Sequence, residues 1–270
     1  MSGKNLFRPC IDLHDGKVKQ IVGGTLNTDC GEKNLQTNFV SSHSPAYYAE
    51  MYRRDELHGG HIIKLGANND QAALEALHAW EGHLQIGGGI TAENAAFYLD
   101  NGAAQVIVTS FVFSDGKFQE DNLQKLLKAV GKEHLVLDLS CRKTADGGYT
   151  VMSDRWKNFT SLKLNPDTLD KISRSCCEFL IHAVDVEGKR SGIDHELLDL
   201  LGEYSPIPTV YAGGISGFSD ITAIENTGKG RIGYTIGSAL DIFGGAIPYS
   251  EVVRHDRNQQ NKNFSNKKKV

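Results

Sequence analysis

Two aspartates stand at matching places in the two halves of the sequence. Asp12 ends a predicted strand that begins at Phe7, and Asp138 follows the apolar run L-V-L. A carboxylate in an apolar site becomes a stronger base, and a second carboxyl that stays protonated can donate a proton across the same site. The pair therefore predicts acid–base chemistry at carbon. The alternative is that both carboxylates only accept hydrogen bonds from backbone N–H groups at strand ends.

Glycine pairs after two further apolar runs predict phosphate sites. Without Cβ atoms, glycine N–H groups can approach a ligand closely, and the N-terminus of a following helix attracts an anion. The alternative is that these glycines only form tight turns between strand and helix. The candidate phosphate residues are Gly213, Gly214, Gly237 and Ser238 in the second half, and Gly88, Gly89, Thr109 and Ser110 in the first half.

An internal repeat relates these two sets of residues. L-Q-I-G-G-G-I-T (84–91) is followed by V-T-S (108–110), and T-V-Y-A-G-G-I-S (209–216) is followed by I-G-S (236–238). Self-similarity of this kind indicates two half-domains of the same design. The two phosphate sites should then lie on opposite sides of one mouth. We expect an elongated ligand with a phosphate at each end.

The elements that must position these residues alternate between short strands and amphipathic helices. Eight such pairs in about 250 residues match an α/β fold, the (β/α)8 barrel, whose active site lies at the carboxyl ends of its strands. An open, doubly wound sheet is the alternative. The predicted strands are 7–12, 61–65, 84–87, 106–109, 135–139, 179–184, 209–212 and 233–236, and the predicted helices include 72–80, 92–101, 123–130, 167–175, 194–202 and 218–226.

Composition sets further limits. The 270 residues carry a formal charge of −4, and a protein without basic excess is a poor candidate for binding nucleic acid. No apolar run approaches the ~20 residues of a membrane-spanning helix, and no targeting segment is evident at the N-terminus. We expect a cytoplasmic monomer with one barrel domain at 1–253 and a polar, basic, disordered tail at 254–270.

Other polar residues are weaker candidates for substrate contact. Arg142 and Asp185 could bind the substrate, although for Arg142 a solvent-facing salt bridge is an equal alternative. Trp156, in a predicted loop at 143–164, could stack on a flat base or simply pack. His182 could face the mouth, but no histidine pair has zinc-ligand spacing, and a structural role is the more common one. We therefore expect no metal.

Longer motifs resemble the eukaryotic-type phosphoribosylformimino-5-aminoimidazole carboxamide ribotide isomerases of histidine biosynthesis. The resemblance implies a (β/α)8 barrel without metal or organic cofactor. It also implies an Amadori rearrangement, from aminoaldose to aminoketose, of a ribonucleotide with two phosphates. The motifs are C-I-D-L-H-D-G-K-V-K-Q-I-V-G-G-T-L (10–26), V-L-D-L-S-C-R-K (136–143), H-A-V-D-V-E-G (182–188) and T-I-G-S-A-L-D-I-F-G-G (235–245).

The resemblance implies that Asp12 is the base and that the acid lies on the fifth strand. Bacterial members read L-D-x-R there, so alignment on Arg142 selects Ser140, whereas the internal repeat selects Asp138. We choose Asp138, because a serine does not readily supply a proton. The alternative functions are the cyclase of imidazole glycerol phosphate synthase and a phosphosugar-binding barrel without catalysis. The cyclase's usual lysine is replaced by His14, which favours the isomerase.

Overall fold

Eight parallel strands form the centre of the structure, a computed structural model that describes residues 5–21 and 36–267. The strands are β1 (Cys10–His14), β4 (His61–Lys64), β5 (Leu84–Gly87), β6 (Ala103–Val108), β9 (Leu135–Asp138), β13 (Glu178–His182), β14 (Thr209–Ala212) and β15 (Ile232–Thr235). They pair in the order β15-β14-β13-β9-β6-β5-β4-β1. A parallel bridge between Phe7 and Tyr234 joins the two ends, so the sheet closes into a barrel.

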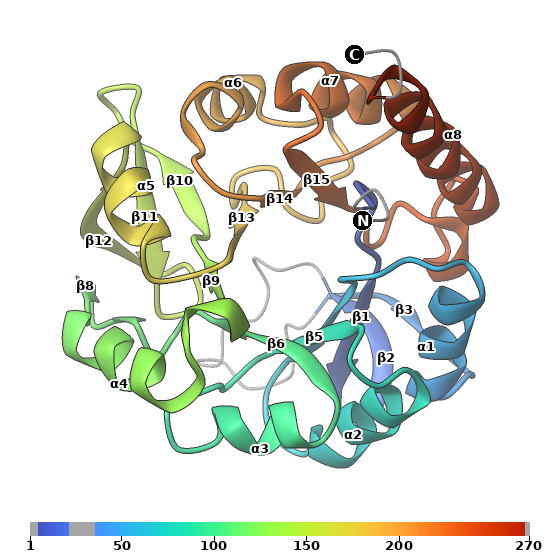
Figure 1. Cartoon of the computed structure of the whole chain (residues 1–270), viewed down its shortest axis with the longest axis horizontal. Helices are drawn as coiled ribbons and strands as arrows, with labels where there is room; N and C mark the ends of the chain where they lie inside the picture. Colours follow the sequence, from blue (N-terminus) through green and yellow to red (C-terminus); the bar gives the residue numbers. More distant parts are fainter. Residues whose placement is uncertain (1–4, 22–35, 268–270) are drawn as a thin grey trace.

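Helices surround the strands, one after each barrel strand (Figure 1). They are α1 (Pro45–Arg54), α2 (Asp70–Ala79), α3 (Ala95–Asp100), α4 (Glu120–Val130), α5 (Pro166–Ser173), α6 (His195–Tyr204), α7 (Phe218–Gly228) and α8 (Tyr249–Lys267), with 3-10 turns η4 (Lys132–His134) and η5 (Asp241–Phe243). The predicted (β/α)8 fold is confirmed, and each of the eight predicted strands overlaps a barrel strand. Among the described residues, no helix has the length and apolarity needed to cross a membrane.

The alternation of side chains along each strand decides which residues enter the barrel. On β9, Leu135 and Leu137 pack outward in the large core between strands and helices, whereas Val136 packs inside the barrel. Asp138, two residues beyond Val136, therefore points inward at the carboxyl end of β9. The same period carries Leu180, inside the barrel, to His182 at the end of β13.

Extra strands follow three of the barrel strands. They are β2 (Lys17–Ile21) and β3 (Thr37–Val40) after β1, β7 (Phe113–Ser114) and β8 (Lys117–Phe118) after β6, and β10 (Cys141–Lys143), β11 (Tyr149–Ser153) and β12 (Asn158–Leu164) after β9. A turn at Asp15 and Gly16, both with positive φ, connects β1 to β2 as an antiparallel hairpin. The prediction that residues 143–164 form a loop is wrong, because β10, β11 and β12 form an antiparallel sheet. Trp156 lies between β11 and β12.

The disordered tail predicted from residue 254 is also wrong for residues 254–267, which continue α8. Asp256 is fully buried and accepts hydrogen bonds from the backbone N–H groups of Leu6 (2.8 Å) and Phe7 (3.0 Å). Arg257 forms an ion pair with Asp55 of the α1 C-cap. Asp256 and Arg257 thus tie this part of α8 to the barrel, and composition does not reveal these contacts. Residues 268–270 lie outside the described part.

Candidate active site

A pocket opens at the carboxyl ends of the barrel strands, where both predicted catalytic aspartates lie. Because side chains alternate along each barrel strand, both aspartates point into the barrel, and residues far apart in sequence meet in one cavity. The predicted site residues that line it are Asp12, Thr109, Asp138, Trp156, Gly213, Gly214, Gly237 and Ser238. The structure thus brings together both aspartates and the whole predicted phosphate site of the second half.

Asp12 is held by the hairpin that follows its own strand. The side chain of Gln20, on β2, donates a hydrogen bond of 2.8 Å from Nε2 to Asp12 Oδ2. Burial raises the pKa of Asp12 to about 6 and the negative charge of Glu187 adds to the rise, while the Gln20 hydrogen bond and His182 oppose it. Asp12 is therefore a carboxylate of increased basicity that still ionises near neutral pH.

Asp138 accepts three hydrogen bonds from side chains around it. Thr109 Oγ1 lies 3.1 Å from Oδ2, and Ser140 Oγ and His182 Nδ1 lie 2.9 Å and 3.1 Å from Oδ1. Burial raises the pKa of Asp138, but His182 and the three hydrogen bonds outweigh it and keep the pKa below its ordinary value. The surrounding donors favour the ionised form of Asp138, whereas the sequence predicted that one carboxyl of the pair stays protonated.

Ser140, the other candidate position on this strand, also lines the pocket. Its hydroxyl donates to Asp138 rather than standing apart from it. Both positions face the barrel interior because they are two residues apart in extended chain. The two candidates therefore belong to one hydrogen-bonded group, in which Asp138 is the only carboxylate.

His182 has a larger place in the site than the sequence indicated. Burial lowers its pKa, but the charge and hydrogen bond of Asp138, together with Glu187 and Asp12, raise it to about 9. The ring is therefore a cation at neutral pH. The indole of Trp156 also lines the pocket, with its ring centroid 6.2 Å from that of His182.

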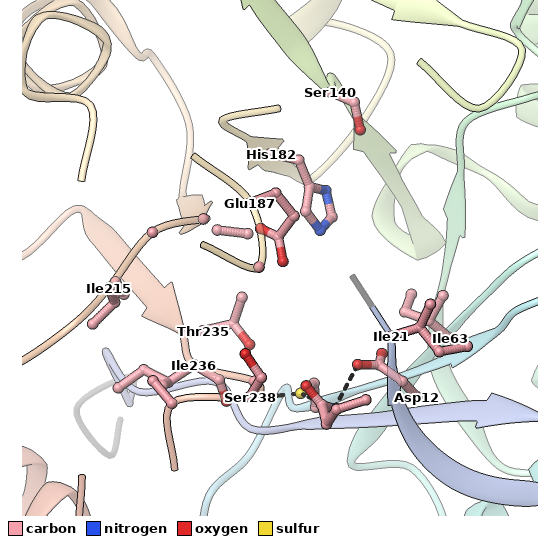
Figure 2. Close-up of a pocket in the computed structure, with 18 of the residues that line it drawn as sticks. Asp12, Ile21, Ile63, Ser140, His182, Glu187, Ile215, Thr235, Ile236 and Ser238 are labelled. Carbon is pink, nitrogen blue, oxygen red and sulfur yellow. Dashed lines mark hydrogen bonds between the residues drawn. The ribbon is translucent and has the colours of Figure 1, made fainter. Parts of the chain in front are cut away.

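Two polar residues of the pocket were missed by sequence reasoning. Glu187 Oε2 and Thr235 Oγ1 are buried without a hydrogen-bond partner among the described residues, and both line the cavity. Figure 2 shows Glu187 and His182 pointing into the cavity that Asp12 faces. Buried polar atoms without partners are costly, so these atoms suit contact with polar groups of a substrate. Glu187 belongs to the motif H-A-V-D-V-E-G (182–188), which carries part of the family resemblance, but the motif alone indicates no role for this residue.

The predicted phosphate site of the second half depends on glycine for close packing. Gly214 has φ +76°, and a Cβ there would lie 2.1 Å from the carbonyl oxygen of Gly192. Gly192 in turn donates a backbone hydrogen bond of 3.0 Å to Gly214. This contact brings the loop after β13 onto the site, where Arg190 Nε lies 3.3 Å from Ser238 Oγ. Arg190 is a cation beside the predicted anion site, and no motif in the sequence pointed to it.

The first-half phosphate residues are not gathered in the same way. Thr109 lines the pocket, whereas Gly88, Gly89 and Ser110 do not. Gly88 has φ +90°, and a Cβ there would lie 2.1 Å from the carbonyl oxygen of Lys64, so packing alone explains this glycine. Gly89 has φ +69° with open space around it. A phosphate at this loop therefore stays a prediction.

Arg142 and Asp185 contact each other rather than the pocket. Arg142 Nε lies 3.0 Å from Asp185 Oδ1, and neither residue lines the cavity. The salt-bridge alternative therefore describes Arg142 better than the expected substrate contact does. Within residues 5–21 and 36–267, no group of three or more His, Cys, Asp or Glu side chains is arranged to hold a metal ion.

Comparisons with known proteins agree over nearly the whole chain. The family model described as "Histidine biosynthesis protein" matches residues 7–247. A Medicago truncatula protein, named chloroplastic 1-(5-phosphoribosyl)-5-((5-phosphoribosylamino)methylideneamino)imidazole-4-carboxamide isomerase, is 49% identical over 94% of this chain and 82% of its own length. Isomerases of the same name from Neurospora crassa and Saccharomyces cerevisiae are 46% and 45% identical. Each covers 94% of this chain, and the alignments span 99% and 98% of the relatives.

Proposed function

The chain belongs to the histidine biosynthesis protein family, and we propose that the pocket performs the isomerisation for which its relatives are named by acid–base catalysis. The enzyme is an aldose–ketose isomerase, which converts the phosphoribosylformimino carboxamide ribotide to its ribulosyl form. The observation that carries the proposal is the meeting of Asp12 and Asp138 in one pocket with a glycine-rich anion site beside them.

The reaction needs a proton donor and a proton acceptor on one sugar. A proton delivered to the furanose ring oxygen breaks its bond to C1, and the lone pair of the attached nitrogen forms a Schiff base. Asp12 then removes the C2 proton, and the electron pair forms the C1–C2 double bond of an enolamine. A carboxylate with a pKa of about 6 is ionised at neutral pH and more basic than an ordinary aspartate, which suits it to this step. The other proton comes from Asp138 or from one of the residues that are hydrogen-bonded to it.

The substrate's two phosphates must be held at some distance from this chemistry. One fits the loop of Gly213 and Gly214, where backbone N–H groups and the Arg190 guanidinium offer donors. The other would bind the loop at Gly89, which lies in the opposite half of the barrel. The repeat in the sequence supports this second assignment. We further propose a cytoplasmic monomer that requires no cofactor and binds neither nucleic acid nor membrane.

The test is an assay of the purified protein with the aminoaldose ribotide. We expect conversion to the aminoketose without added metal, nucleotide or ammonia. Conversion of the ketose only when ammonia is present would identify the cyclase reaction instead. Tight binding of the aminoaldose with no conversion would identify a binding protein, and either result would overturn the proposal.

A further inference from the structure

Three hydrogen-bond donors surround the carboxylate of Asp138 and favour its ionised form. Ser140 and His182 occupy Oδ1, and Thr109 occupies Oδ2. Each of these partners directs a donor at the carboxylate, and a carboxylate that accepts several hydrogen bonds holds its negative charge strongly. Protonation of Asp138 would weaken these hydrogen bonds, and they keep its pKa below the ordinary value. A cationic neighbour of Asp138 is therefore a better proton donor than Asp138 itself.

His182 is the neighbour that meets this requirement. Because an ionised carboxylate only accepts, the Nδ1 atom of His182 carries the hydrogen of the 3.1 Å contact with Asp138. The other ring nitrogen, Nε2, then remains to exchange a proton with a bound molecule. The ring lines the pocket and points into the cavity from β13, and Asp12 faces this cavity from β1 (Figure 2).

We propose that the imidazolium of His182 is the general acid of this isomerase, that Nε2 delivers the proton to the furanose ring oxygen, and that Asp138 positions the ring and stabilises its charge. The inference rests on the proposed isomerase reaction and deepens it. It changes the role of Asp138 from proton donor to positioning residue, and it assigns a catalytic role to a histidine that the sequence had indicated as structural.

The charged groups that face His182 support this assignment. Asp138 from β9, Glu187 from the loop after β13 and Asp12 from β1 all favour the cationic ring, and against the opposing effect of burial they raise its pKa to about 9. His61, from β4, also lines the pocket. Burial first, and then the charge of His182, lower the pKa of His61 to about 3. His61 is therefore neutral at the pH where His182 is charged, and it does not compete as a donor.

The protons balance over one turnover. His182 gives one proton to the ring oxygen as the bond between that oxygen and C1 breaks, and Asp12 takes one proton from C2. The enolamine then becomes the ketose when C1 receives the proton from Asp12 and the C2 hydroxyl returns its proton to His182. Both residues regain their starting states, and no oxidant, reductant or second substrate is consumed.

The decisive experiment is chemical rescue of His182→Ala. We expect this variant to lose at least about 100-fold in kcat, within the range for general acid catalysis, while its KM stays within a few-fold. Added imidazole should restore a saturable part of kcat, and the rescue should follow the imidazolium fraction as pH varies. Activity like that of the unmodified enzyme in His182→Ala, or a loss that imidazole does not relieve although the variant binds substrate, would overturn the proposal.

Asp138→Asn separates the two possible proton donors. Without the carboxylate, burial lowers the pKa of His182 from about 9, so the basic limb of kcat/KM should move to lower pH, with activity retained on the acidic side. A variant that binds substrate yet is inactive at every pH would instead identify Asp138 as the donor. His134→Asn is the control, because His134 is exposed at the other end of the barrel. A failure of the isomerase function itself would show in the unmodified enzyme, before any variant is compared.

Discussion

Gln20 on β2 connects the carboxylate of Asp12, the proposed base, to the proposed phosphate loop at Gly237. Its Nε2 atom lies 2.8 Å from Asp12 Oδ2, while its Oε1 packs against Gly237, where a Cβ would lie 2.5 Å away. One amide therefore contacts both the proposed base and the loop proposed to bind a phosphate of the substrate. The hairpin that carries Gln20 is an addition to the barrel, so the base depends on an element outside the eight-strand scaffold.

We predict that Gln20→Leu shifts the acidic limb of the pH profile. The hydrogen bond from Gln20 stabilises ionised Asp12 and lowers its pKa, so its loss raises the pKa above about 6. Activity should fall several-fold near pH 6 and recover at higher pH, as measured by kcat/KM across the pH range. Lys19→Gln is the matched control on the same strand, because Lys19 pairs with Asp15 outside the pocket. An acidic limb that stays in place in Gln20→Leu would contradict the prediction.

Asp12→Asn should abolish turnover and stabilise the fold at the same time. The folded protein binds the Asp12 proton more tightly than the unfolded chain, since its pKa is about 6 rather than 3.8. This favours folding below about pH 4 and is lost as pH rises through about 6, so ionised Asp12 destabilises the fold at neutral pH by up to about 3 kcal/mol. The variant should therefore have the higher Tm at pH 8 and lose that advantage near pH 4. Equal Tm values at pH 8 would show that burial of Asp12 has no such cost.

The barrel could be predicted well because each of its strands is visible as a local pattern in the sequence. Apolar runs ending in Asp12, Asp138 or Gly213 mark both the strands and the edge where they end. The internal repeat then related the two halves without any knowledge of contacts. Insertions such as β10–β12 were mistaken for a loop, because short antiparallel strands with mixed polarity resemble one.

The parts of the site that the sequence could not predict depend on contacts between loops. Arg190 lies beside Ser238, and Gly192 of the same loop packs on Gly214. No local sequence pattern predicts this contact between the loops after β13 and β14. The roles proposed for Asp138 and His182 likewise depend on the hydrogen bond between them. Residue type and strand position predicted which side chains enter the pocket, but not which of them holds the proton.

Arg190→Ala should weaken substrate binding without changing the chemical step. A charge-assisted hydrogen bond to phosphate contributes about 1.5–3 kcal/mol, so we expect KM to rise roughly 10- to 100-fold while kcat stays within about two-fold. Arg190→Lys should recover part of the loss. Lys189→Ala is the control, because this neighbouring cation contacts the carbonyl oxygen of Asp185 instead. If KM changes equally in both variants, general charge rather than Arg190 holds the phosphate.

Gly89→Ala and Gly82→Ala form a matched pair that tests the first-half phosphate loop. Both glycines have positive φ, +69° and +76°, and neither would place a Cβ within 4 Å of another atom. The cost of an alanine in this conformation, about 1–2 kcal/mol, should be the same in both, so their Tm values should fall together. Only Gly89→Ala should also raise KM, because its backbone N–H belongs to the proposed site. A KM unchanged in Gly89→Ala would remove the second phosphate from this loop.

Asp256→Ala should show that α8 is part of the barrel rather than an appended tail. Asp256 is fully buried and accepts from Asn5, Gln260 and the backbone N–H groups of Leu6 and Phe7. Removing the carboxylate leaves these donors without partners, which we expect to cost about 3 kcal/mol and to lower Tm by roughly 6–12 °C. Glu251→Ala, an exposed carboxylate on the same helix, should change Tm by less than about 2 °C. If the two variants melt alike, the hydrogen bonds of Asp256 contribute little, and the residues after 253 can be removed without loss of the fold.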